Sequence, residues 1–240
     1  ALVLAIVVGK RQGFPKSVQR PHNLPMVMLG AGLLWFGWFG FNGGSAFAAD
    51  GLAGLAWVNT TAATAAAILG WLLVEKLRDN YCTSLGAASG VVAGLVTITP
   101  AAGDLNPVTS LIIGLFGGML ACLGVGLKFR FGFDDSLDVV GVHLVAGLWG
   151  TVAVAFFAND RGIFTGGAEG WKLLIVQILI AAIAVAFAAV FTAIIAVILK
   201  ATIGWRVSDQ IETDGIDFGG HRETGYDIGG RAMRGTTSRN

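Results

Sequence analysis

Residues 133–158, with the sequence FDDSLDVVGVHLVAGLWGTVAVAFFA, form an apolar run of membrane-spanning length. A helix needs about 20 such residues to cross the hydrocarbon core of a bilayer. One ionisable side chain, His143, lies near the middle of the run. A histidine at that depth costs free energy, so it marks a functional site by default, although a core histidine bonded to one neighbour is the plainer alternative. The run therefore predicts a membrane protein with His143 as its first candidate residue.

The composition supports a membrane protein. The chain is 55% hydrophobic and 13% charged, with a mean hydropathy of +0.73. Soluble domains carry about 25% charged residues. A net charge of +1, without a basic stripe interleaved with aromatics, gives no reason to expect a nucleic-acid partner. Cys82 and Cys122 lie far apart without CxxC spacing, which favours free thiols, and no metal or cofactor is expected.

Six apolar runs predict an all-α, polytopic transmembrane helix bundle over residues 26–199. The predicted spans are residues 26–47, 55–74, 85–99, 108–127, 136–158 and 171–199. The chain opens with ALVLAIVVG, which is too short to span a membrane, so residues 1–8 are expected to be the end of a truncated helix. Residues 9–25 form a basic loop, and residues 200–240 form a polar tail.

Charge predicts how these spans are oriented. The loop before the first span has four Lys/Arg residues, and the loops at 75–84 and 128–135 have two each. The loops after the first span and at 100–107 have none, whereas the loop at 158–172 has two that are offset by acidic residues. Cytoplasmic loops carry the Lys/Arg excess, so the basic loop and the C-terminal tail are expected in the cytoplasm. Glycines at three- and four-residue spacing predict a closely packed bundle without a wide aqueous pore.

Three carboxylates open the run that carries His143. Asp134 and Asp135 are expected to cap the helix N-terminus, and Asp138 is expected to tie the helix to a neighbour rather than relay protons. Helical spacing places small or apolar residues on the face of His143: Val139, Val140, Ala146, Gly147 and Gly150.

The first span ends in aromatic residues that are followed by a hydroxyl. An interfacial aromatic belt is one interpretation of this cluster, which contains Trp35, Phe36, Trp38, Phe39 and Phe41. Ser45 lies four residues beyond Phe41, on the same helix face and about 6 Å further outward. A cation entering from outside would meet a hydroxyl and aromatic rings, then a Phe plug, then an imidazole in an apolar channel. This order suits a small cation that is recognised, stripped of its charge and passed on neutral.

Six sequence blocks together resemble the ammonium transporter family (Amt/MEP/Rh), on its bacterial Amt branch. They are PHNLPMV (21–27), WFGFNGGSA (38–46), VNTTAATAAAILGW (58–71), GLVTITPAAG (94–103), DDSLDVVGVH (134–143) and GWRVSDQIETDGIDFGGHRETGYD (204–227). The resemblance implies an eleven-helix, inverted-repeat transporter in the cell membrane, assembled as a homotrimer with one pore per subunit and a cytoplasmic C-terminus. This chain would then be the second half of that fold.

The resemblance also implies residue roles. Ser45 matches the serine of an outer ammonium recruitment site, and Phe41 matches one of two gate phenylalanines. Trp38 and Val139 match pore-lining positions, and His143 matches the second of two paired histidines. The first histidine, the other gate Phe, and the recruitment-site Trp and Asp belong to the family's first half. The 240 residues alone are therefore expected not to conduct ammonium or methylammonium.

The predicted function is transport of ammonium or ammonia, not an enzymatic reaction. The alternative within the family is an ammonium sensor that signals through its tail, and the resemblance implies a PII-type signal protein as a possible partner at the cytoplasmic face. A b-type haem protein with His143 as axial ligand is the alternative from another class. It normally needs two intramembrane histidines, and this chain has one.

Overall fold

The computed structural model describes residues 1–17, 20–166 and 168–225 of the chain, and these residues contain helices and no strands. The elements are α1 (Leu2–Val8), α2 (Leu24–Gly44), α3 (Gly51–Asp79), α4 (Ser84–Ile98), α5 (Pro107–Val125), α6 (Leu127–Phe131), a π-helical turn (Val140–Val145), α7 (Ala146–Phe157), α8 (Ala168–Thr202), α9 (Asp209–Asp214) and a second π-helical turn (Asp217–His221). Six helical segments are long and apolar enough to cross a membrane. The prediction of an all-α transmembrane bundle is confirmed.

The ends of two spans differ from the predicted ranges. The first span was expected to run to Phe47, but α2 ends at Gly44 and Ser45 caps it. The span expected from residue 136 becomes helical only after Asp138, whose backbone has a left-handed φ of 60°. Both shifts place a polar residue of interest outside the regular helix. The predicted tail continues to residue 240, of which residues 226–240 lie outside the described part.

Side-chain caps fix where the helices of the bundle begin. The side chains of Asn23, Asp50, Thr83 and Asn106 accept hydrogen bonds from the first backbone N–H groups of α2, α3, α4 and α5. Each satisfies an amide that has no partner within its helix. A proline also stands in the first turn of α2 and of α5, where its missing N–H costs nothing.

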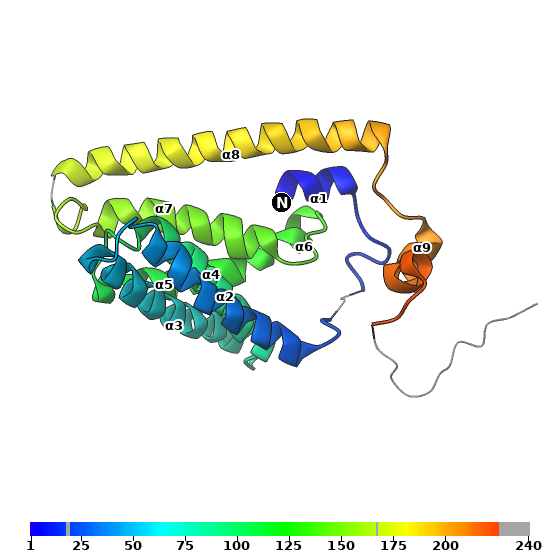
Figure 1. The fold of residues 1–240 in the computed structure, drawn as a ribbon, viewed down its shortest axis with the longest axis horizontal. Coiled ribbons are helices and arrows are strands. Elements are labelled where there is room, and N and C mark those ends of the chain that lie inside the picture. Colours follow the sequence, from blue (N-terminus) through cyan, green and yellow to red (C-terminus); the bar gives the residue numbers. More distant parts are fainter. Residues whose placement is uncertain (18–19, 167, 226–240) are drawn as a thin grey trace, which may run out of the picture.

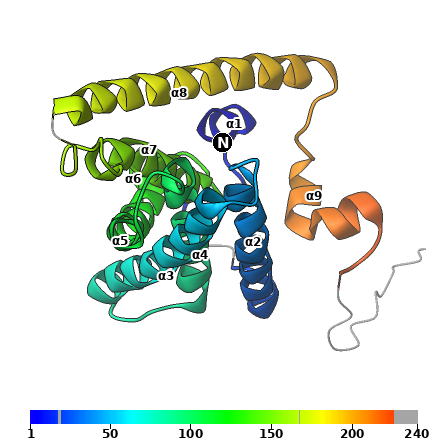
Figure 2. The ribbon, with the colours of Figure 1, turned by 60° about the vertical axis from the view of Figure 1, so that its left-hand side comes forward.

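α3 lies at the lower edge of the bundle in Figure 1 and packs against α5 and α4. α2 covers α4 and α3 on one side, and α7 packs against α4 and α5 on another (Figure 2). α8 is the longest helix, with 35 residues, and lies across α7 and α1 in both views. The helix that carries His143 is therefore held between the bundle and α8.

Glycines allow α3 and α5 to touch along their backbones. A Cβ at Gly114 would clash with the backbone of Ala63, and a Cβ at Gly118 would clash with the carbonyl oxygen of Ala67. Close backbone approach is how helices gain packing energy in lipid, where the hydrophobic effect between helices is absent. Gly114 and Gly118 lie four residues apart, so they present one continuous seam to α3.

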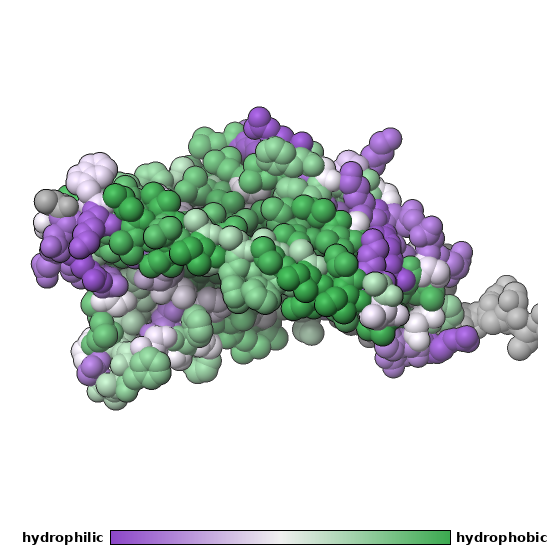
Figure 3. Space-filling model, turned by 90° about the horizontal axis from the view of Figure 1, so that it is seen from above, coloured by the Kyte–Doolittle hydropathy of each residue, from purple (hydrophilic) through white to green (hydrophobic). Residues whose placement is uncertain are grey.

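The outer surface of the described chain is that of a membrane protein. Apolar residues cover the middle of the face formed by α8, and hydrophilic residues gather at its two ends (Figure 3). The window of α8 with the highest hydropathy has no buried residue. A helix that is apolar all round and unburied is stable only in lipid or against another apolar surface.

Candidate functional site

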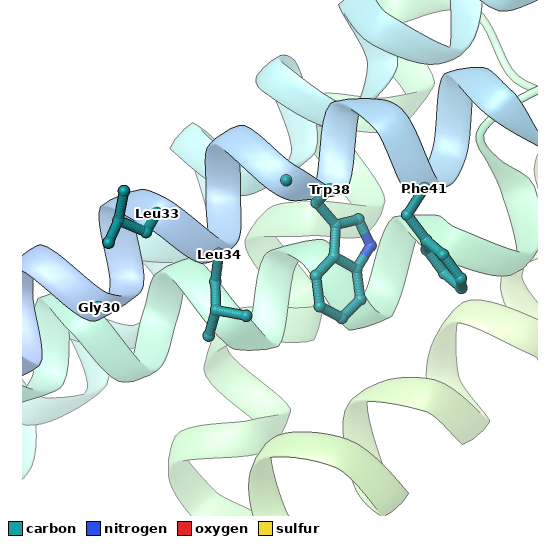
Figure 4. Close-up of a pocket in the computed structure, with 6 residues that line it drawn as sticks. Gly30, Leu33, Leu34, Trp38 and Phe41 are labelled. Atoms are coloured by element: carbon teal, nitrogen blue, oxygen red, sulfur yellow. The ribbon is translucent and has the colours of Figure 1, made fainter.

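Trp38 and Phe41 project from the same side of α2 (Figure 4). Their rings meet edge to face, with centroids 5.4 Å apart and an interplanar angle of 69°. Phe41 is 58% exposed, so most of its ring faces out of the bundle. The two rings thus form an aromatic pair that is open on one side.

Thr99 holds the Trp38 ring in place. The indole Nε1 of Trp38 donates a hydrogen bond of 2.8 Å to Thr99 Oγ1, and that hydroxyl donates in turn to the carbonyl oxygen of Leu95 across 2.7 Å. The acceptor lies 61 residues away in sequence, at the end of α4. Sequence reasoning missed Thr99. The available signal was a hydroxyl residue before Pro100, at a helix end.

Ser45 lies one turn beyond Phe41 and is exposed. Its hydroxyl donates a hydrogen bond of 2.8 Å to the carbonyl oxygen of Phe41. The hydroxyl proton is therefore occupied, and the lone pairs of Ser45 Oγ remain as acceptors. A group that offers only acceptors suits a ligand that has only donors.

A groove with a volume of about 410 Å³ runs along α2 beside the aromatic pair (Figure 4). Its lining is apolar apart from the indole N–H and consists of Gly30, Leu33, Leu34, Gly37, Trp38 and Phe41. Within the described residues, no hydrogen bond or ring contact joins this wall to Val139 or His143, which lie on another element.

His143 lies within the π-helical turn Val140–Val145. Its side chain is exposed and Val139 is half-buried, whereas Val140, Ala146 and Gly150 are buried. His143 is thus exposed, while three of the residues expected beside it on one helix face are buried. A π-helical turn bonds each N–H five residues back instead of four, which shifts the register of the side chains across it.

Ionic contacts fix the start of this turn. Asp134 does not cap the helix; its Oδ2 accepts from the backbone N–H of Arg11 at 2.9 Å and lies 3.3 Å from the Arg11 guanidinium Nε. Asp135 does act as a cap, because its Oδ2 accepts from the N–H of Val140 at 2.7 Å. Asp138 forms an ion pair with Lys128 on α6, as expected of a residue that ties the helix to a neighbour.

Burial raises the pKa of the Asp138 carboxyl above its usual range, and the ammonium of Lys128 opposes that rise.

No group of three His, Cys, Asp or Glu side chains in the described part of the chain is placed to hold a metal ion. The candidate site therefore has two separate parts, an aromatic wall with a hydroxyl acceptor on α2 and an imidazole in the π-helical turn Val140–Val145.

The model of the Ammonium Transporter Family matches residues 1–226. The chain belongs to the ammonium transporter family. The resemblance seen in the sequence blocks is confirmed. An ammonium transporter of Mycobacterium tuberculosis is 54% identical over 95% of this chain and 50% of its own length, so the chain spans about half the length of the curated relatives it matches.

Solved structures of the ammonium transporter family share the fold. A structure described as a sensor Amt protein aligns with a TM-score of 0.82 at 31% identity, over 91% of this chain and 56% of that chain. Mep2 of Candida albicans aligns with a TM-score of 0.79 at 30% identity, over 87% of this chain and 49% of its own. Both confirm the transporter fold for this half-length chain.

Proposed function

We propose that the complete protein that contains this chain carries ammonium across the cell membrane. The observation that carries the proposal is the geometry of Ser45, whose proton is donated to the backbone carbonyl oxygen of Phe41 and whose lone pairs remain as acceptors. Ser45 lies one helical turn beyond Phe41, whose ring pairs with that of Trp38. Ammonium has N–H donors and a positive charge, so it needs hydroxyl acceptors and aromatic faces. A cation over an aromatic ring gains about 0.5–2 kcal/mol.

The cation loses its proton before it passes the apolar interior. A charge at the centre of a bilayer costs at least about 2.5–3.5 kcal/mol, which an apolar wall such as the groove on α2 does not offset. We place deprotonation next to exposed Phe41, where water on the outer side accepts the proton, and Trp38 and Val139 line the path beyond it. Neutral ammonia then passes His143, whose two ring nitrogens donate and accept hydrogen bonds, and is reprotonated inside.

We further propose a multi-pass protein of the cell membrane, with the tail in the cytoplasm and three copies in the assembly. The orientation follows from the basic residues of the loop at 9–25 and from Lys200 and Arg206 at the start of the tail. In this role the protein is a transporter, without a resident cofactor.

Uptake of radiolabelled methylammonium, an ammonium analogue, tests the proposal. The complete protein, expressed in a cell that lacks its own ammonium transporters, is expected to give saturable uptake that ammonium competes away. A tail-truncated variant serves to separate transport from signalling. Absence of uptake, with the protein present in the membrane at the level of a working relative, would contradict transport.

One observation favours a second function, ammonium sensing through the tail. Arg206 donates to the carbonyl oxygens of Val8 at 3.1 Å and Lys10 at 2.7 Å, and Glu212 accepts from the N–H of Gln12 at 2.6 Å. The tail is thus attached to the loop that also contacts Asp134 beside the His143 turn. A PII-type signal protein at this cytoplasmic face is the partner we propose. If added ammonium raises the hydrogen exchange of residues 206–214 without net uptake, sensing is favoured over transport.

A further inference from the structure

The π-helical turn Val140–Val145 lies between two segments whose positions are fixed independently. A wider turn of this kind is rare and frequently occurs at functional sites. Each residue of an α-helix turns the side-chain direction by about 100° around the helix axis. A change of one residue in the turn would therefore rotate the His143 side chain by about 100° around that axis. The turn can persist only where the helix is held on both sides of it.

The cytoplasmic side is held by charges and by a close backbone contact. Lys128 is 8% exposed, pairs with the Asp138 carboxylate, and donates to the carbonyl oxygen of Asp135 at 3.2 Å. The Asp135 carboxylate accepts a hydrogen bond of 2.7 Å from the backbone N–H of Val140, where the turn begins. A Cβ at Gly141 would lie 2.6 Å from the backbone nitrogen of Val125, so this side cannot slide along α5.

The opposite side is held by α4. A Cβ at Gly150 would clash with the carbonyl oxygen of Thr97. The hydroxyl of Thr97 donates to the carbonyl oxygen of Ala146, the first residue of α7, at 3.5 Å. The regular helix after the turn is therefore fixed against α4 by contacts that involve neither Lys128 nor Asp138.

We propose that the Lys128–Asp138 ion pair is a positioning device that keeps Val140–Val145 in its π-helical form and so sets the direction of the His143 imidazole. The inference rests on the proposed function, because it assigns these two residues to the conduction step. Lys128 reaches both ends of the loop segment 135–138 at once, through the Asp135 carbonyl and the Asp138 carboxylate. Without Lys128, the start of the turn loses its anchor on α6, and the π-helical hydrogen bonds of Val140–Val145 open more often.

The local backbone fits this role. Asp138 has a φ of 60°, a conformation that Asp and Asn adopt more readily than other residues with a side chain. Asp138 lies directly before the helical residues with this left-handed backbone, and its ion pair with the buried Lys128 ammonium stabilises that arrangement. The Lys128 side chain is 10% exposed and that of Asp138 is 33% exposed, so removing Asp138 is costly mainly because the Lys128 ammonium stays buried without its carboxylate.

Three variants of the complete protein test the proposal. Asp138→Asn keeps the backbone preference and removes the charge, Lys128→Met removes the ammonium at similar length, and the double variant leaves no unpaired charge. The matched control is Asp104→Asn, which breaks the exposed Asp104–Arg161 pair of 2.5 Å far from the turn. Methylammonium uptake is measured as maximal rate and KM, together with hydrogen exchange of the amides at 140–146.

Both single variants and the double variant are expected to lose about tenfold in maximal rate with an unchanged KM, because recruitment at Ser45 is untouched. Exchange at 140–146 is expected to rise at least tenfold in all three. Asp104→Asn is expected to match the parent protein in its maximal rate and in its exchange at 140–146. A double variant with the parent's rate would overturn the proposal, since only charge balance would then matter.

Unchanged exchange at 140–146 in Asp138→Asn would also overturn the proposal. If the parent protein shows no uptake at all, the proposed transport function fails, and the exchange measurement still decides the role of the ion pair. If Lys128→Met does not reach the membrane, Asp138→Asn and the double variant carry the decision.

Discussion

The indole N–H of Trp38 donates to the hydroxyl of Thr99 across 2.8 Å and ties the aromatic pair on α2 to the end of α4. The Thr99 hydroxyl cannot rotate freely, because its own proton is donated to Leu95. The bond therefore sets the plane of the Trp38 ring, and through the edge-to-face contact it limits where the Phe41 ring can lie.

Thr99→Val should release the Trp38 ring without changing the size of residue 99. A neutral hydrogen bond contributes about 0.5–1.5 kcal/mol, so we expect methylammonium uptake to fall about two- to tenfold. Thr99→Ser retains the hydroxyl and should keep most of the parent's rate. Equal uptake by the Val and Ser variants would contradict this role for Thr99.

Ser45→Ala should weaken recruitment of the cation. A hydrogen bond to a charged group is worth about 1.5–3 kcal/mol, which corresponds to about a tenfold to hundredfold rise in KM. Ser45→Thr keeps an acceptor oxygen and should stay close to the parent. Initial uptake rates over a range of methylammonium concentrations measure the effect, and an unchanged KM in Ser45→Ala would rule out Ser45 as an acceptor.

Gly118→Ala should destabilise the bundle. The added Cβ meets the carbonyl oxygen of Ala67 on α3, and overpacking of this kind costs about 1–3 kcal/mol, more than the helix propensity that Ala gains. Gly32→Ala on α2 is the control, because nothing lies within 4 Å of its added Cβ. Thermal unfolding in detergent should give a lower Tm for Gly118→Ala only. Equal Tm values would contradict the close contact between α3 and α5.

The tail contact of Glu212 should depend on pH. The N–H of Gln12, and then Arg206, lower the pKa of the Glu212 carboxyl below its ordinary value of 4.5. A lowered folded pKa means that the contact contributes fully above 4.5 and is lost as the pH falls through the lowered value. Hydrogen exchange at residues 206–214 should therefore rise only below pH 4.5, and Glu212→Gln should abolish this pH dependence. Loosening between about pH 5 and pH 7 would contradict the assignment.

The membrane spans could be predicted because lipid imposes long apolar runs whatever the partners of each helix are. The α2 site was also local: Phe41 and Ser45 are four residues apart, and helical spacing alone brings them together. The aromatic pair of Trp38 and Phe41 follows from the same periodicity. These features depend on one helix and can be inferred from its sequence.

Contacts between distant segments could not be predicted. The partner of Trp38 is 61 residues away, and the partner of Asp134 is 123 residues away at Arg11, so capping was the wrong interpretation for Asp134. The direction of His143 depends on a π-helical turn that apolar periodicity does not reveal, since an extra residue in one turn leaves the run equally apolar. Lys128 was similarly hidden, because a lysine after an apolar run is usually a solvated end.

Methylammonium uptake by His143→Ala in the complete protein tests the central claim most directly. If neutral ammonia passes the imidazole, the maximal rate should fall at least about tenfold while the KM set at Ser45 and Phe41 stays unchanged. The variant must reach the membrane in the amount of the parent. An unchanged maximal rate in His143→Ala would contradict a conduction path past His143.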